Sequence, residues 1–233
     1  MRHLMSLWLF GLALALTMPI VTASSGRAEL KAETECVPYD SAYESAPLFK
    51  IKPGAGQQRV YLYKGARRCP GDQPCASRQK AYLVDGNIVF AGPPSQSFRC
   101  AYYGTPKGKI IAGFIPDDNL TPEKEVTELS ADFLVGTWRF EDDSIEIKAA
   151  GEGKVEADGN AVYQTSTTEN DGAFSATAAV PASGDVVFKD GEGDAACEVK
   201  LHRRGPYLVA SDNSQCGGMN VRFNGIYTKA AGK

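Results

Sequence analysis

The chain has 233 residues, of which 28 are acidic and 25 basic, so its net charge near neutral pH is −3. Neither half of the chain behind its first segment, residues 24–129 or residues 130–233, is basic enough to indicate a nucleic acid as partner, because such binding needs a concentrated positive surface. Two histidines beside six cysteines also exclude many metal sites and nucleophilic triads. We therefore expect no cofactor, no metal site and no catalytic residue.

The first segment is typical of an export signal. Arg2 and His3 precede an almost wholly apolar run from Leu4 to Val21, and Val21-Thr22-Ala23 supplies the small residues that a signal peptidase requires. We expect residues 1–23 to be removed, with a cut after Ala28 as the alternative. An uncleaved anchor is the other interpretation, since the run approaches the ~20 residues that cross a bilayer. No second run of that length follows, so cleavage would leave no integral membrane span.

The cysteines behind this signal predict disulfides and a periplasmic or secreted location. One pair flanks a tight loop containing two prolines and a glycine, and another brackets a hairpin-like segment. The last pairing follows only by elimination. The three expected bridges join Cys69 to Cys75, Cys197 to Cys216, and Cys36 to Cys100.

Residues 24–50 are polar and weakly patterned, which predicts a flexible lead-in to a first barrel over residues 51–122. Short runs rich in β-formers alternate there with turns, and no stretch keeps helical spacing over three turns. Asp85-Gly86 is typical of a hairpin turn. This pattern is typical of a small barrel or sandwich. The expected strands span residues 59–63, 81–84, 87–90, 98–103 and 109–115.

Three segments of this region resemble a bacterial Src-homology-3-like domain: residues 81–89, residues 98–103 and the step Gly113-Phe114-Ile115-Pro116. Phe114 stands where that family usually has a tryptophan. Members often lie in the cell envelope, several bind peptidoglycan or its stem peptides, and others are spacers. The resemblance implies that the partner is a peptidoglycan fragment or an envelope protein.

The aromatic residues of this half are the candidate ligand-binding residues, because a tyrosine offers sugars and peptides an apolar face and a polar tip. Tyr61 and Tyr63 share a strand face, whereas Tyr102 and Tyr103 point to opposite faces, so one of the latter belongs in the core. The alternative is that the rings only cover the sheet. The candidates are Tyr61, Tyr63, Tyr82, Tyr102, Tyr103 and Phe114.

A polar linker over residues 123–130 leads to a second barrel, an antiparallel meander of about eight strands over residues 131–229 that its own side chains can fill. Asp158-Gly159-Asn160 predicts a hairpin turn. Gly136-Thr137-Trp138 resembles the first-strand step of lipocalin-like barrels. In that family a late basic residue often packs on the tryptophan, and Arg222 is the candidate. Alternatively, Trp138 is simply a core residue.

The C-terminal pattern around Cys197, Cys216-Gly217-Gly218 and residues 221–227 resembles a module of proteobacterial envelope proteins, some of which are described as lysozyme-inhibitor-like. The second half is also the more acidic one, and complementary charge would speed its association with a basic lysozyme. An inhibitor or immunity protein against a lysozyme-like enzyme is therefore the alternative function.

Other clusters of polar residues favour local structural roles. His202 has no nucleophile motif beside it, and the carboxylates at residues 117–118 and 141–143 fall in apparent turns. The calcium-loop pattern that starts at Asp190 fails at Ala195 and Leu201. The sequence thus predicts an all-β, monomeric, non-enzymatic envelope protein of two small antiparallel β-barrels after a cleaved signal peptide.

Overall fold

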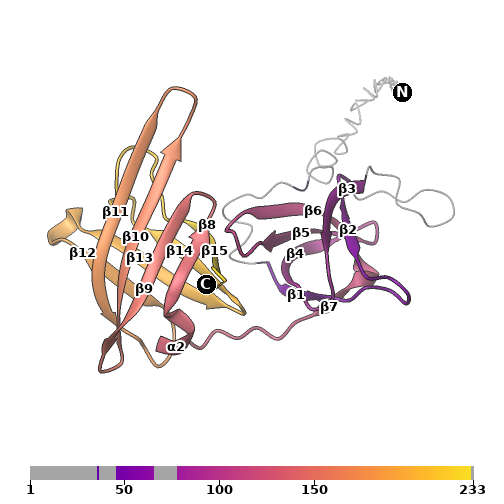
Figure 1. The fold of residues 1–233 in the computed structure, drawn as a ribbon, viewed down its shortest axis with the longest axis horizontal. Coiled ribbons are helices and arrows are strands. Elements are labelled where there is room, and N and C mark those ends of the chain that lie inside the picture. Colours follow the sequence, from indigo (N-terminus) through magenta and orange to yellow (C-terminus); the bar gives the residue numbers. More distant parts are fainter. Residues whose placement is uncertain (1–35, 37–45, 66–77, 232–233) are drawn as a thin grey trace, which may run out of the picture.

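The computed structural model describes residues 36, 46–65 and 78–231, which form two antiparallel sheets (Figure 1). The all-β fold class is confirmed, with a half-barrel followed by a nearly closed barrel. The first sheet has the order β3-β2-β6-β5-β4-β1-β7. Its strands are β1 (Leu48–Ile51), β2 (Val60–Tyr63), β3 (Arg78–Leu83), β4 (Ile88–Ser95), β5 (Phe98–Gly104), β6 (Ile110–Pro116) and β7 (Leu120–Pro122).

The second sheet has the order β11-β10-β9-β8-β15-β14-β13-β12. The short helix α2 (Ala131–Leu134) precedes it, and 3₁₀ turns occupy Asp117–Asn119 and Gly193–Ala195. Its strands are β8 (Gly136–Phe140), β9 (Asp143–Gly151), β10 (Lys154–Gln164), β11 (Glu169–Ala179), β12 (Val186–Asp190), β13 (Cys197–Arg204), β14 (Tyr207–Asp212) and β15 (Gly225–Lys229).

Strand β1 begins at Leu48, inside the stretch for which the sequence predicts a lead-in. Its register places Phe49 opposite Val89 on β4 and opposite Pro122 on β7. Phe49 and Ile51 are buried in the half-barrel core. Both partners of this strand are distant in sequence, and local patterning carries no sign of such pairing.

The seam of the second barrel lies between β11 and β12, the two ends of its sheet. The Asp190 carboxylate accepts a hydrogen bond from the Ser175 amide across it at 2.9 Å, and Gly172 forms an isolated bridge with Gly217. Side chains fill the interior, the largest being Trp138, Tyr227, Phe188 and Phe223, each at most 1 % exposed. The expectation of a barrel filled by its own residues is met.

The turn predicted at Asp158-Gly159-Asn160 is wrong, because β10 runs through these residues without a break. Gly159 lies opposite Phe174, and a Cβ atom there would come within 2.1 Å of the Phe174 ring. The glycine makes room for an aromatic ring on the facing strand. In a sequence, a glycine that forms a turn cannot be distinguished from a glycine that makes room for a neighbouring side chain.

Trp138 lies in the core of the second barrel, and its indole nitrogen donates to the carbonyl of Leu134 on α2 at 2.7 Å. The basic side chain over its ring is Lys229, with Nζ 5.4 Å from the ring centroid. The expectation of Arg222 in this role is wrong, since that guanidinium is directed to the carbonyl of Val221. The register explains the difference, because Lys229 on β15 is the direct partner of Trp138 on β8.

Two of the predicted disulfides are confirmed, Cys36–Cys100 and Cys197–Cys216. The pair Cys69 and Cys75 lies outside the described residues. Disulfides of this kind are typical of an oxidising environment. Among the described residues, no helix has the length and apolar character needed to cross a membrane.

The two barrels pack directly on one another (Figure 1). An apolar cluster joins Phe90 and Tyr102 of the first sheet to Tyr207, Val209 and Ile226 of the second. The ring centroids of Phe90 and Tyr207 are 5.2 Å apart, and the Tyr207 hydroxyl donates to the carbonyl of Ile88. The barrels therefore share a buried core in addition to their linker.

Backbone contacts extend this interface. The Glu141 amide donates to the carbonyl of Gly108 at 2.9 Å, and the Glu141 carboxylate accepts from the Ile110 amide at 3.0 Å. Gly108 has a positive φ of 86°, and a Cβ atom there would lie 2.8 Å from the Cβ of Arg139. Only glycine suits both that backbone conformation and that close approach.

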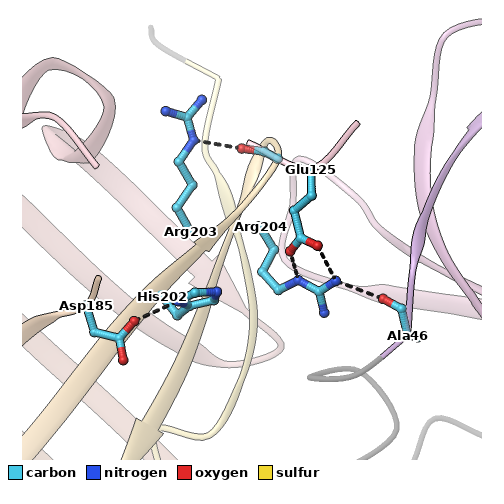
Figure 2. Close-up of polar contacts among 7 residues, drawn as sticks. Ala46, Glu125, Asp185, His202, Arg203 and Arg204 are labelled. Carbon is cyan, nitrogen blue, oxygen red and sulfur yellow. Dashed lines mark hydrogen bonds and ion pairs between the residues drawn. The ribbon is translucent and has the colours of Figure 1, made fainter. Parts of the chain in front are cut away.

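A buried cation fixes the linker to both barrels (Figure 2). The Arg204 side chain is 6 % exposed, and its guanidinium pairs with both carboxylate oxygens of Glu125. It also donates to the carbonyl of Ala46 at 3.0 Å. Next to it, Arg203 donates to the backbone carbonyl of Glu128 at 2.8 Å. A bidentate pair of this kind sets a defined geometry as well as contributing energy.

Replacing Glu125 tests how much this pair contributes. The variant Glu125→Gln removes a negative charge that pairs with a buried guanidinium, which costs stability because a charge in low dielectric needs charged partners. We expect the free energy of unfolding at pH 7 to fall by about 2 kcal/mol, a value reduced for the partial exposure of Glu125. Chemical denaturation measures it.

Glu128→Gln is the matched control, because Glu128 is exposed and contacts Arg203 through its backbone carbonyl only. It should change stability by less than about 0.5 kcal/mol. Equal stability of the two variants would contradict a structural role for the Arg204–Glu125 pair.

Candidate ligand-binding groove

A groove of about 820 Å³ lies on the first barrel, between the loop after β1, the outer face of β2 with Arg78 of β3, and the turn that follows β6. Its size is within the range of small-ligand and peptide sites. In Figure 1, β2 and β3 lie on the side of the first barrel that is turned away from the second. The walls are Gly54, Gly56, Gln57, Gln58, Arg59, Val60, Tyr61, Tyr63, Arg78, Phe98, Pro116, Asp118 and Asn119.

Strand alternation explains why tyrosines face this groove. On β2, Val60 and Leu62 are buried in the core, so Tyr61 and Tyr63 point outward and are half-buried. A register shift lies between Tyr61 and Tyr63, where β2 pairs with β3. Gln79 of β3 donates its side-chain amide to the carbonyl of Ala112 on β6 at 3.2 Å, which ties β3 to the sheet at this irregular point.

Four side chains form a continuous stack over β2 and β3. The Arg59 guanidinium carbon lies 4.3 Å from the ring centroid of Tyr82. The Tyr82 and Tyr61 rings meet edge-to-face at 5.9 Å, and Arg78 lies 4.2 Å from the Tyr61 centroid. Cation–π contacts of this kind orient a guanidinium and leave its N–H edge available.

The structure brings together only part of the predicted ligand-binding set. Tyr61 and Tyr63 line the groove, and Tyr82, 42 % exposed, stands beside them in the stack. Tyr102 is buried in the cluster between the barrels. Tyr103 packs on the half-barrel core, as expected for the neighbour of a tyrosine that faces the other way.

Phe114, the last predicted ligand-binding residue, is buried. It packs with Phe98 beside the disulfide Cys36–Cys100 and Tyr63. It therefore lies beneath one end of the groove and supports Tyr63, whose ring meets Phe98 at 6.0 Å.

Sequence reasoning missed Arg59 and Arg78 as part of the site. Arg59 is the first residue of the strand expected over residues 59–63, and Arg78 begins β3. The available signal was alternation, because Arg78, Lys80 and Tyr82 occupy every second position of β3 and all three are exposed. A basic and aromatic outer face was therefore readable once β3 was extended back to residue 78.

Both carboxylate clusters hold structural contacts. Asp117 pairs with Arg99 at 2.5 Å, and the Lys109 ammonium donates to the Glu141 carboxylate across the barrel interface at 2.9 Å. No group of three or more metal-ligating residues is found in the described ranges.

His202 has a carboxylate partner, which the sequence did not reveal. Its Nδ1 lies 2.6 Å from the Asp185 carboxylate (Figure 2). The two residues are next to the paired positions Leu201 and Val186 of β13 and β12. Within the described part of the chain, no hydroxyl or thiol group is hydrogen-bonded to this imidazole. Among the described residues, the pair thus provides a histidine oriented by a carboxylate and no hydroxyl or thiol nucleophile beside it.

Among the described carboxyl groups, Asp143 has the pKa that is shifted furthest from its ordinary value. It is 8 % exposed at the start of β9, and burial raises its pKa to about 6. The Val162 amide, which donates to it at 2.9 Å, opposes this shift, and the charges of Asp142 and Glu141 add to it. It lies in the second barrel, so it bears on stability and not on the groove.

The chain matches no protein-family model, no curated protein and no solved structure. The fold defines it as an all-β protein of two packed antiparallel barrels, one of which carries an aromatic and basic groove. Its function is inferred from the chemistry of that groove.

The raised pKa of Asp143 predicts a pH-dependent stability. Its folded-state pKa of about 6 lies above the ordinary value near 3.9, so its stabilising contribution is present below pH ~4 and is lost as the pH rises through 6. Asp143→Asn keeps the oxygen that accepts from Val162 and removes the charge. We expect this variant to be more stable than the parent at pH 7, by on the order of 2 kcal/mol, and equal to it near pH 4.

The control is Asp85→Asn, since Asp85 is exposed on the first barrel and is not among the charges that shift the pKa of Asp143. Denaturant unfolding at several pH values between 4 and 8 measures both variants. A parent and an Asp143→Asn variant whose stabilities differ by the same amount at every pH would refute the buried, titrating carboxyl.

Proposed function

We propose that this protein is an exported, non-enzymatic envelope protein whose first barrel binds cell-wall peptide or glycan through the groove over β2 and β3. The observation that carries the proposal is the group of half-exposed rings beside the groove, Tyr61 and Tyr63 on β2 and Tyr82 on β3. Such rings stack on sugars and on extended peptides alike, because each presents an apolar face next to a polar hydroxyl.

The arrangement of the barrels supports this role. The second barrel is filled by its own side chains, and the opposite side of the first barrel is covered by the interface. The groove is thus an open, concave aromatic surface on a rigid scaffold, which is where binding sites are found in small β domains.

The proposed location is the periplasm or the exterior of the cell, after removal of residues 1–23. The apolar N-terminal run and the two disulfides support it, because such bridges persist in oxidising compartments. We further propose that the exported protein is a monomer.

Retention on purified peptidoglycan tests the proposal. Wild-type protein should sediment with insoluble sacculi above the level of serum albumin, and Tyr61→Ala should reduce the retained fraction about fivefold, because it removes a central ring of the groove. Tyr163→Ala, which truncates a half-buried tyrosine on β10 of the second barrel, is the matched control and should be retained normally. Retention of wild-type protein no better than albumin would end the proposal.

A second candidate function is inhibition of a lysozyme-like enzyme. The observation that favours it is a set of exposed acidic side chains on the long strands β9 to β11, including Glu146, Glu156, Glu169 and Asp171. They would attract a basic enzyme. Lysozyme activity on cell walls that is unchanged by a large excess of this protein would count against it.

A further inference from the structure

We infer that the groove recognises its ligand by two carboxylate groups, which Arg59 and Arg78 bind, and that the ligand is therefore an extended acidic peptide and not a neutral glycan. The inference rests on the proposed function and specifies the ligand class of that same site.

The two guanidinium groups are available for a ligand. Arg59 and Arg78 are exposed, and their contacts are with Tyr82 and Tyr61 respectively. Neither forms an ion pair with any described residue, whereas Arg99 and Arg204 each hold a carboxylate. Cations without a counter-charge on a surface favour an anionic ligand.

Stacking on the rings makes these arginines better receptors than free surface side chains. Each guanidinium lies over an aromatic face at about 4 Å, which restricts its motion before a ligand arrives. The conformational cost of ordering the side chain on binding is then smaller. The planar N–H fork of a guanidinium suits a carboxylate in a bidentate manner.

The stack also limits the spacing of the two anionic groups. The three centroid distances along it add to about 14 Å, which is an upper bound on the distance between the two guanidinium carbons. An extended peptide advances ~3.3 Å per residue, so two acidic side chains up to about four positions apart fit between these arginines. Lys80, exposed between Arg78 and Tyr82 on β3, adds positive charge to the same face.

The edge position of β3 favours a peptide as the ligand. This strand ends the sheet, with β2 as its only partner in the described part of the chain. An extended chain lying along a sheet edge gains backbone hydrogen bonds that a glycan or a lipid headgroup cannot supply in the same register. Within the described residues, the unpaired arginines and the free edge of β3 therefore both favour an extended acidic peptide as the ligand.

Fluorescence anisotropy with labelled peptides tests the inference on the full-length exported protein. The probe contains Asp-Ala-Ala-Ala-Asp in a short glycine-flanked peptide, and its counterpart has Asn at both acidic positions. We expect the diacid to bind at least about tenfold more tightly than the diamide, because each carboxylate gains charge-assisted hydrogen bonds. Affinity should fall as salt rises from 50 to about 300 mM.

Arg59→Gln and Arg78→Gln should each weaken binding of the diacid by about five- to tenfold. Lys154→Gln, which removes one exposed positive charge from β10 of the second barrel, is the matched control and should leave the affinity unchanged. Both arginines are exposed, so circular dichroism should show a normal fold for all three variants.

Several results would contradict the inference. Equal affinity for diacid and diamide, no detectable binding of either, or an effect of Lys154→Gln as large as that of the arginine variants would overturn the inference. So would binding to vesicles of anionic lipid without binding to the diacid. If sacculi still retain the protein in any of these cases, the proposed function stands and only the ligand class is wrong; if sacculi do not, both fail.

Discussion

The contact between the two barrels determines which faces of the first barrel are buried and which remain accessible to a ligand. The side chains of Phe90 and Tyr102 project from one face of the first sheet. They pack in a cluster with Tyr207, Val209 and Ile226 of the second. Residues adjacent to them, Val89 and Ala101, fill the half-barrel core on the other side. The middle of β4 and of β5 is therefore buried on both faces, whereas the groove lies on the part of this barrel that the second barrel does not cover.

A half-barrel gains its rigidity from this arrangement. Its sheet has two open ends at β3 and β7, and a small open sheet buries little apolar area by itself. The second barrel covers part of it, and the Arg204–Glu125 pair and the Cys36–Cys100 disulfide fix the segments that flank it. The Arg–Tyr stack thus stands on a supported surface, and such support is what a preorganised binding site requires.

Much of the fold was readable from the sequence, and the exceptions share a cause. Turn residues and short apolar runs predicted the all-β class, and two cysteine pairs were assigned as they occur. The failures at β1, at Gly159 and at Arg222 all concern which strand faces which, and such pairing depends on contacts far apart in sequence.

The candidate site was only half predictable for the same reason. Tyr61 and Tyr63 were found by alternation within one strand, whereas Tyr102 and Phe114 were misplaced because their environment is created by the second barrel and by the neighbouring strand β5. An uninterrupted apolar run such as Ile88–Ala91 was the available sign that both faces of a strand are covered. Tyr207-Leu208-Val209-Ala210 carries the same sign on the opposite side of the interface.

Amide hydrogen exchange of the exported protein, with and without soluble peptidoglycan fragments, tests most directly whether the free face of the first barrel is the recognition surface. Ligand-induced protection should be confined to the peptides that contain residues 54–63 and 78–83, and exchange on β9 to β11 should not change. Protection that appears on the second barrel, with none over β2 and β3, would contradict this account.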